Sequence, residues 1–140
     1  MAAQDLLLWA GTNGVECFDV IYTHSHGGNI VMSAAAQGLK VRVLVLMHVP
    51  ILYRRPPEWR DIAGSFRRVI QIKTRCEWVV MADRNGQRIP RALPHTVPAT
   101  GPLGPWFSHS FFTQVSTWKE RELASLVSYE HSLSTDFVQR

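Results

Sequence analysis

The apolar residues in the first half of the chain fall into blocks whose spacing changes from helical to strand-like and back. Helical spacing predicts a helix over residues 2–10, and a β-branched and aromatic run predicts a strand over 18–23. A polar turn at 24–28 contains two glycines, and residues 29–39 return to helical spacing. The run 41–49 is apolar at nearly every position, as in a strand covered on both faces of a parallel sheet. Together these blocks predict a βαβ unit.

The second half of the chain is less regular. Alternating apolar and polar positions predict a third strand over residues 68–73, and 78–81 is a further short apolar stretch. Residues 89–107 are rich in proline, and we interpret them as a loop or lid. A final helix is expected over 117–129, with its leucine and valine residues on one face. The alternation predicts a three-layer α/β fold, with a mostly parallel sheet and helices on both faces, in one domain spanning residues 1–140.

The composition agrees with one globular domain. The chain has 140 residues, of which 46% are hydrophobic and 19% are charged. The formal charge of +4 is spread without a dense basic cluster, so we expect no nucleic-acid partner. Cys17 and Cys76 are far apart and lack the spacing of a metal or redox site. No apolar run has the length of a transmembrane segment and no signal peptide is evident, so we expect a cytoplasmic protein.

The turn after the first predicted strand carries the sharpest chemical signal. Residues 23–28 read T-H-S-H-G-G. A serine here can sit on a strained strand-to-helix turn with its hydroxyl exposed, and small residues nearby let the chain segments pass closely. The N-terminal end of the helix that follows favours negative charge nearby. The backbone N–H of His26 is a natural hydrogen-bond donor to an oxyanion. Ser25 is therefore the candidate nucleophile, and the alternative is a polar residue that caps the helix.

With this turn the chain resembles the lipase and esterase branch of the α/β-hydrolase family, in which a strand runs into H-S-H-G-G-N and an apolar helix follows. Residues 18–31 carry the resemblance, which extends more weakly to about residue 120. The family order of nucleophile, acid and base implies a catalytic triad of Ser25, Glu77 and His109, with Asp83 as the alternative acid. The resemblance also implies a shortened chain that lacks the N-terminal strands of the full fold.

The function implied by this resemblance is hydrolysis of carboxylic esters through an acyl-enzyme on Ser25. His109 would take the serine proton, and the carboxylate would orient its imidazole. His24 would contact the substrate, and Trp106 and Phe107 would form an apolar wall. The expected partner is a small ester or lipid-like molecule, and this chemistry needs no cofactor and no metal.

Two other functions stay open. A chain derived from a hydrolase but inactive would act as a binding or interaction module, with a homodimer or a complementary chain at its open sheet edge. His24 and His26 form an H-x-H pair typical of zinc hydrolases, although Gly28 and Asn29 stand where further ligands are needed. His48, at the end of an apolar run, is expected to be a satisfied histidine at the edge of the core.

Overall fold

Helices and strands alternate along most of the chain, as the apolar spacing predicts. A computed structural model describes residues 1–73, 93, 96–100 and 111–134. The elements in chain order are α1 (Ala2–Thr12), β1 (Phe18–His24), α2 (Gly27–Ala35), β2 (Val41–Met47), α3 (Pro56–Ala63), β3 (Phe66–Lys73), β4 (Thr96–Thr100), the short 3₁₀ helix η1 (Phe111–Thr113), α5 (Val115–Glu120) and α6 (Leu123–Ser132). The predicted first helix and the predicted βαβ unit are confirmed, with small shifts at the ends of the elements.

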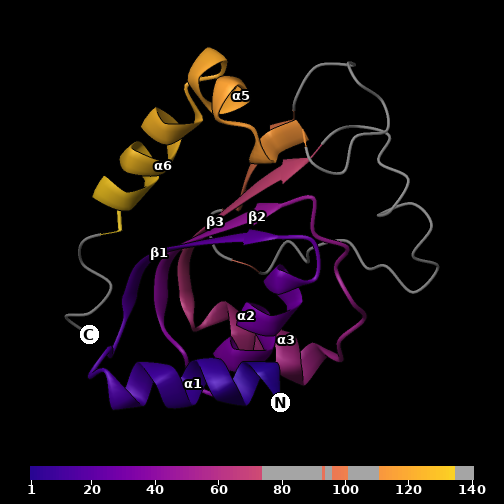
Figure 1. Cartoon of the computed structure of the whole chain (residues 1–140). Helices are drawn as coiled ribbons and strands as arrows, with labels where there is room; N and C mark the ends of the chain where they lie inside the picture. Colours follow the sequence, from indigo (N-terminus) through magenta and orange to yellow (C-terminus); the bar gives the residue numbers. More distant parts are fainter. Residues whose placement is uncertain (74–92, 94–95, 101–110, 135–140) are drawn as a thin grey trace.

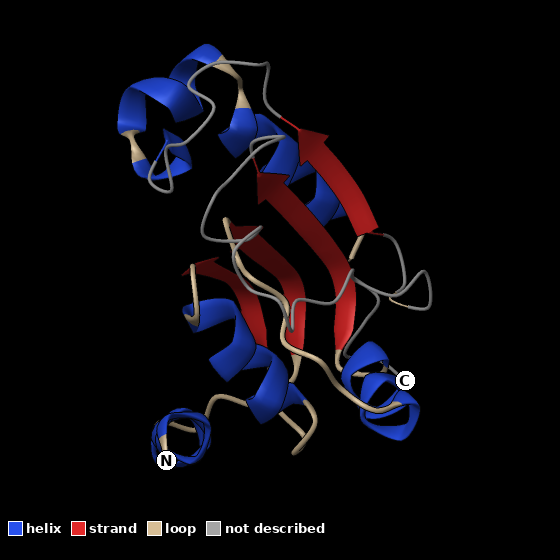
Figure 2. Ribbon diagram, turned by 90° about the vertical axis from the view of Figure 1, so that its right-hand side faces the viewer, coloured by secondary structure: helices blue, strands red, loops and turns tan. Residues whose placement is uncertain are grey.

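The four strands form one parallel sheet in the order β1-β2-β3-β4, which Figure 2 shows as a twisted layer between the helices. β1 and β2 pair from Phe18 opposite Val41 to His24 opposite Met47. Because all strands run in the same direction, their carboxyl ends lie at one edge of the sheet, where open α/β sheets bind ligands.

Apolar side chains on the two faces of the sheet form two separate cores. On one face, Met32 of α2 and Ile62 of α3 pack in the same core as Leu44 of β2, and α1 joins this layer. On the other face, Phe112 of η1 and Val127 of α6 pack against β2 and β3. Figure 1 shows the first group of helices below the sheet and α5 and α6 above it. The described residues therefore form three layers, with helices on both faces of the sheet.

Part of the predicted proline-rich loop is a strand. Thr96–Thr100 forms β4, which pairs with β3 and places Pro98 opposite Gln71. Among the described strands β4 is the outermost on its side, and an edge strand tolerates a proline because one side of its backbone needs no partner. The prediction of a loop or lid over 89–107 is therefore wrong for residues 96–100, which form β4. The apolar stretch 78–81 lies outside the described residues.

The predicted C-terminal helix over 117–129 is two helices. Glu122 lies between α5 and α6 with a left-handed backbone, at a φ of 51°, and the chain changes direction there. No glycine or proline marks this break, so the sequence predicted one continuous helix. The apolar face of the prediction is confirmed, because Leu123 and Val127 are buried against the sheet.

α3 is a helix that the apolar spacing of the sequence does not predict. Pro56 and Pro57 occupy its first turn. Proline is common at this position because its missing N–H has no helical partner there and its φ is already helical. The two prolines therefore mark the start of this helix.

Gly28 allows α2 to lie in direct contact with β2 and the loop after it. A Cβ atom at Gly28 would lie 2.7 Å from both Cγ atoms of Val49 and 2.9 Å from Cδ2 of Leu46. A Cβ atom at Gly27 would lie 4.0 Å from the Cβ of Thr23, which is an ordinary contact distance. The close approach expected near the turn is therefore made at Gly28, and the position of α2 depends on this glycine.

Gly28→Ala is expected to lower the free energy of unfolding by about 1–3 kcal/mol, because the added methyl group overlaps packed side chains. Gly27→Ala is the matched control in the same helical turn, and it should change that free energy by less than about 0.5 kcal/mol or raise it. Urea unfolding of both variants measures the difference. Equal losses in the two variants would show that α2 does not depend on close contact at Gly28.

Candidate active site

Ser25 lies on the turn that joins the carboxyl end of β1 to α2. Its φ is 52°, in the left-handed region that residues other than glycine rarely adopt. Its backbone N–H donates a hydrogen bond to the carbonyl oxygen of Met47 at 3.0 Å, which ties the turn to the end of β2. The residue is half-buried. A strained serine therefore stands at the end of a parallel strand, immediately before a helix.

Thr23 occupies the position where glycine is usual in a nucleophile turn, and the structure accommodates it. Thr23 is buried, and its Oγ1 donates to the carbonyl oxygen of Val45 at 2.9 Å. The hydroxyl therefore has its hydrogen-bond partner within the sheet. A Cβ atom at the neighbouring Gly27 would lie at an ordinary contact distance from the Cβ of Thr23. Thr23 does not obstruct the turn.

The start of α2 follows Ser25 directly. His26 precedes the helix as its N-cap residue, and within the described residues its side chain makes no capping hydrogen bond. The N–H groups of Gly28 and Asn29 donate to the carbonyl oxygens of Ser25 at 3.3 Å and His26 at 3.0 Å. In the described part of the chain, the N–H of His26 has no backbone acceptor, which is common for the first donors of a helix.

His48 follows β2 and lies beside the Ser25 turn. It is fully buried, and its backbone is left-handed with a φ of 51°. Its Nε2 accepts a hydrogen bond from the backbone N–H of Phe112 at 3.4 Å. Its ring packs edge-on against His24, with ring centroids 6.1 Å apart. The prediction of a satisfied histidine at the core edge is confirmed, and the half-buried His24 is held next to it.

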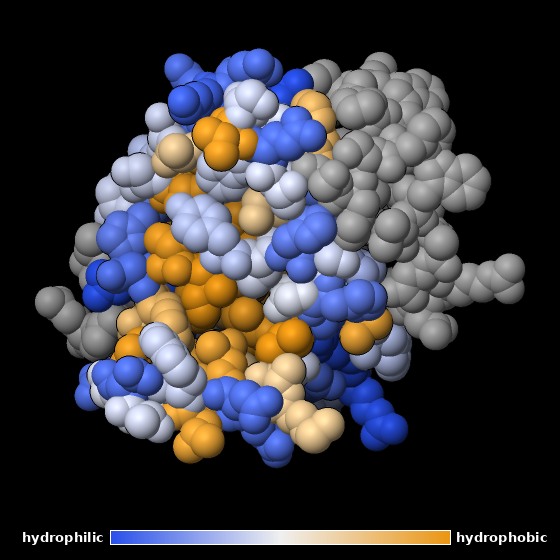
Figure 3. Space-filling model, in the orientation of Figure 1, coloured by the Kyte–Doolittle hydropathy of each residue, from blue (hydrophilic) through white to orange (hydrophobic). Residues whose placement is uncertain are grey.

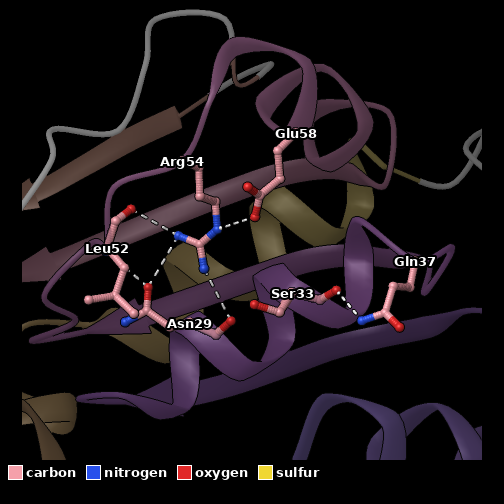
Figure 4. Close-up of polar contacts among 6 residues, drawn as sticks. All are labelled: Asn29, Ser33, Gln37, Leu52, Arg54 and Glu58. Carbon is pink, nitrogen blue, oxygen red and sulfur yellow. Dashed lines mark hydrogen bonds and ion pairs between the residues drawn. The ribbon is translucent and has the colours of Figure 1, made fainter.

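Asn29 and Arg54 form a buried polar cluster at the first turn of α2 (Figure 4). Asn29 Nδ2 donates to the carbonyl oxygen of Pro50 at 2.7 Å, and Oδ1 accepts from the N–H of Leu52 at 3.1 Å. Arg54 donates to Asn29 Oδ1 and to the Asn29 carbonyl oxygen, both at 3.3 Å, and to the Leu52 carbonyl oxygen at 3.1 Å. Its Nε lies 3.2 Å from a carboxylate oxygen of Glu58. The cluster ties the loop after β2 to α2.

The charge of Arg54 is enclosed in this cluster. Its side chain is 4% exposed, and burial lowers the pKa of its guanidinium group, while the Glu58 carboxylate acts in the opposite direction. The apolar and polar pattern of the sequence does not predict this cluster. Two signals were present: a polar asparagine within an apolar helix, and Arg54 four residues before Glu58 at the spacing of a helical ion pair.

The other predicted site residues lie outside the described residues: Glu77, Asp83, Trp106, Phe107 and His109. In chain order, the two candidate acids follow β3, and the candidate base follows β4. The structure therefore describes the turn that carries the candidate nucleophile and the strands that precede the candidate acids and the candidate base.

A metal site at His24 and His26 finds no support among the described residues. His26 is exposed and His24 is half-buried. No group of three or more histidine, cysteine or acidic side chains gathers as metal ligands within residues 1–73 and 111–134.

Comparison of the chain with protein-family models, curated proteins and solved structures finds no match. The relation to α/β-hydrolases thus stays a prediction that depends on the turn and the order of the elements. Of the helices that the structure describes, none is long and apolar enough to cross a membrane.

Replacing Asn29 tests the buried cluster. Asn29→Ala should lower the free energy of unfolding by about 2–4 kcal/mol, because it leaves buried backbone groups and part of a buried guanidinium without partners. Glu58→Gln should cost less than about 1 kcal/mol, because the Glu58 side chain is 41% exposed.

Gln37→Ala is the control for these measurements. Gln37 is an exposed residue just after α2, whose Nε2 donates to the Ser33 carbonyl oxygen at 3.0 Å, and its loss should change stability by less than about 0.5 kcal/mol. Denaturant unfolding ranks the three variants. A cost for Asn29→Ala no larger than that for Gln37→Ala would contradict a stabilising role for the cluster.

Proposed function

We propose that the protein is a serine hydrolase that cleaves carboxylic esters through an acyl-enzyme on Ser25. The observation that carries this proposal is the left-handed backbone of Ser25, a non-glycine residue on the turn between a parallel strand and a helix. Strained backbone of this kind is concentrated at functional sites. A turn of this type exposes a serine hydroxyl at the carboxyl edge of the sheet, where substrates bind.

The surroundings of Ser25 support the same chemistry. α2 directs its positive N-terminal end toward the turn, and the His26 N–H is available to a developing oxyanion. The order of the strands supports the proposed triad, because Glu77 follows β3 and His109 follows β4 in the chain. This is the order nucleophile, acid and base that serine hydrolases with an α/β sheet use.

In the proposed reaction, Ser25 Oγ attacks the ester carbonyl carbon while His109 accepts the serine proton. The tetrahedral oxyanion receives a hydrogen bond from the His26 N–H. The bond to the alcohol oxygen then breaks, and His109 returns the proton to the leaving alcohol. Water, deprotonated by the same histidine, attacks the acyl-enzyme and releases the carboxylic acid and free Ser25.

A fluorophosphonate probe tests this proposal, because it modifies only activated serines. We expect one adduct, mapped by peptide mass spectrometry to Ser25, which Ser25→Ala abolishes. Ser33→Ala, a second serine in the α2 region, is the control and should label like the wild type. Absence of labelling in a chain shown to be folded would favour an inactive interaction module instead.

Measurements of kcat for ester hydrolysis then show which of the two candidate acids, Glu77 or Asp83, takes part in catalysis. If Glu77 orients His109, Glu77→Gln should lower kcat by about 10⁴-fold, and Asp83→Asn should leave it within a few fold. The reverse pattern would assign the role to Asp83. If both variants keep the activity of the wild type, a triad with either carboxylate is contradicted.

A further inference from the structure

His48 is a buried histidine at the carboxyl edge of the sheet that the proposed reaction does not use. It follows β2 directly, and the N–H of Ser25 donates to the carbonyl oxygen of the preceding residue, Met47. The N–H of His48 itself donates to the carbonyl oxygen of Ile72 in β3 at 3.0 Å. The backbone of His48 therefore lies between the Ser25 turn and the end of β3, where the order of the strands places it.

The imidazole ring of His48 reaches from this edge to η1. Its Nε2 accepts a hydrogen bond from the N–H of Phe112 at 3.4 Å, and the centroids of the two rings lie 5.4 Å apart. The first N–H groups of a helix have no partner within that helix. Phe112 is the second residue of η1 and is buried, so water does not supply the acceptor and His48 does. An accepting Nε2 is unprotonated, which leaves the proton of the neutral ring on Nδ1.

Hydrogen bonds fix the position of η1 more narrowly than its apolar contacts do. Phe112 packs in the same core as Val45 of β2. Apolar side chains also reach the surface, and Figure 3 shows them between α1 and the C-terminal helices. Such contacts are non-directional, whereas a hydrogen bond prefers one distance and angle. The carbonyl oxygen of Phe112 accepts from the indole N–H of Trp118, which belongs to α5, so the bond to His48 ties η1 to the sheet.

We propose that His48 is a positioning residue, which in its neutral form holds η1 at the carboxyl edge of the sheet beside the Ser25 turn. The candidate base His109 lies outside the described residues, but it stands three positions before Phe112. Three residues span at most about 11 Å, so fixing Phe112 limits where His109 can lie. A misplacement of about 1 Å can lower a rate by about 10²-fold. The hold on η1 does not depend on the chemistry of Ser25, whereas the effect on catalysis rests on the proposed function.

Two substitutions separate the hydrogen bond from the space that His48 fills. His48→Phe keeps a buried ring and removes the acceptor. His48→Gln keeps an acceptor, because its Oε1 reaches about as far from the backbone as Nε2 of histidine. Both variants place a new residue at the left-handed φ of 51°, so they share that cost. Ile62→Val, in the core on the other face of the sheet, is the control for a loss of packing alone.

Hydrogen exchange tests the hold on η1 without a measurement of activity. In His48→Phe the Phe112 amide should exchange about tenfold faster relative to the amides of β2. β2 lies between two strands, so its amides report the stability of the sheet. The ratio should stay near its wild-type value in His48→Gln and in Ile62→Val. An unchanged ratio in His48→Phe, or an equal rise in His48→Gln, would overturn the proposal.

Hydrolysis of p-nitrophenyl acetate by the full chain tests the effect on catalysis. His48→Phe should lower kcat by about 10–100-fold and change KM by less than about threefold. His48→Gln should recover most of this loss, and Ile62→Val should keep the wild-type kcat. An active wild type whose kcat is unchanged in His48→Phe would overturn the positioning role. A wild type that turns over no ester but shows the expected exchange pattern would contradict the proposed function and confirm the hold of His48 on η1.

Discussion

The contact between α2 and β2 at Gly28 is the constraint on which the candidate site depends. The missing side chain lets the helix start lie against Val49 and Leu46, where a Cβ atom would overlap them. Because the helix start lies this close to β2, the chain has only a short turn in which to leave β1 and enter α2. Ser25 adopts its left-handed backbone within this turn. The strain at Ser25 is thus maintained by the packing of two neighbouring elements, and local sequence preference alone would not favour it.

A second set of interactions also holds the start of α2, and it joins this helix to the loop after β2. Asn29 and Arg54 fix the loop after β2 through hydrogen bonds to its backbone. A backbone segment that leaves a sheet without regular structure must find partners for its polar groups, and side chains supply them here. Glu58 completes the set from α3, but its exposure means that water competes for its charge. Asn29 and the buried guanidinium group of Arg54 therefore contribute most of the stabilisation that the cluster provides.

The sequence predicted the parts of the fold that depend on local patterns. The apolar runs at β1 and β2, the helical spacing in α2 and the serine turn can each be recognised within a short window of sequence. Features that arise from distant contacts could not be recognised in this way. β4 pairs with β3 despite its proline, and the break at Glu122 has no marker residue. The partners of Arg54 come from three segments that only the fold brings together. For the triad, the sequence predicts an order along the chain, whereas catalysis requires convergence in space.

Ser25 follows the carboxyl end of β1 directly, so the proposed chemistry depends on how firmly the end of this strand is held. Thr23 lies two residues before Ser25, and its hydroxyl donates to the carbonyl oxygen of Val45 in β2. Among the described strands β2 restrains these last residues, because the Thr23 hydroxyl and the Ser25 N–H both donate to its carbonyl oxygens. A nucleophile works best when the segment that carries it is rigid. The turn geometry at Ser25 is set by α2 and β2 within one chain, so it can exist without a partner.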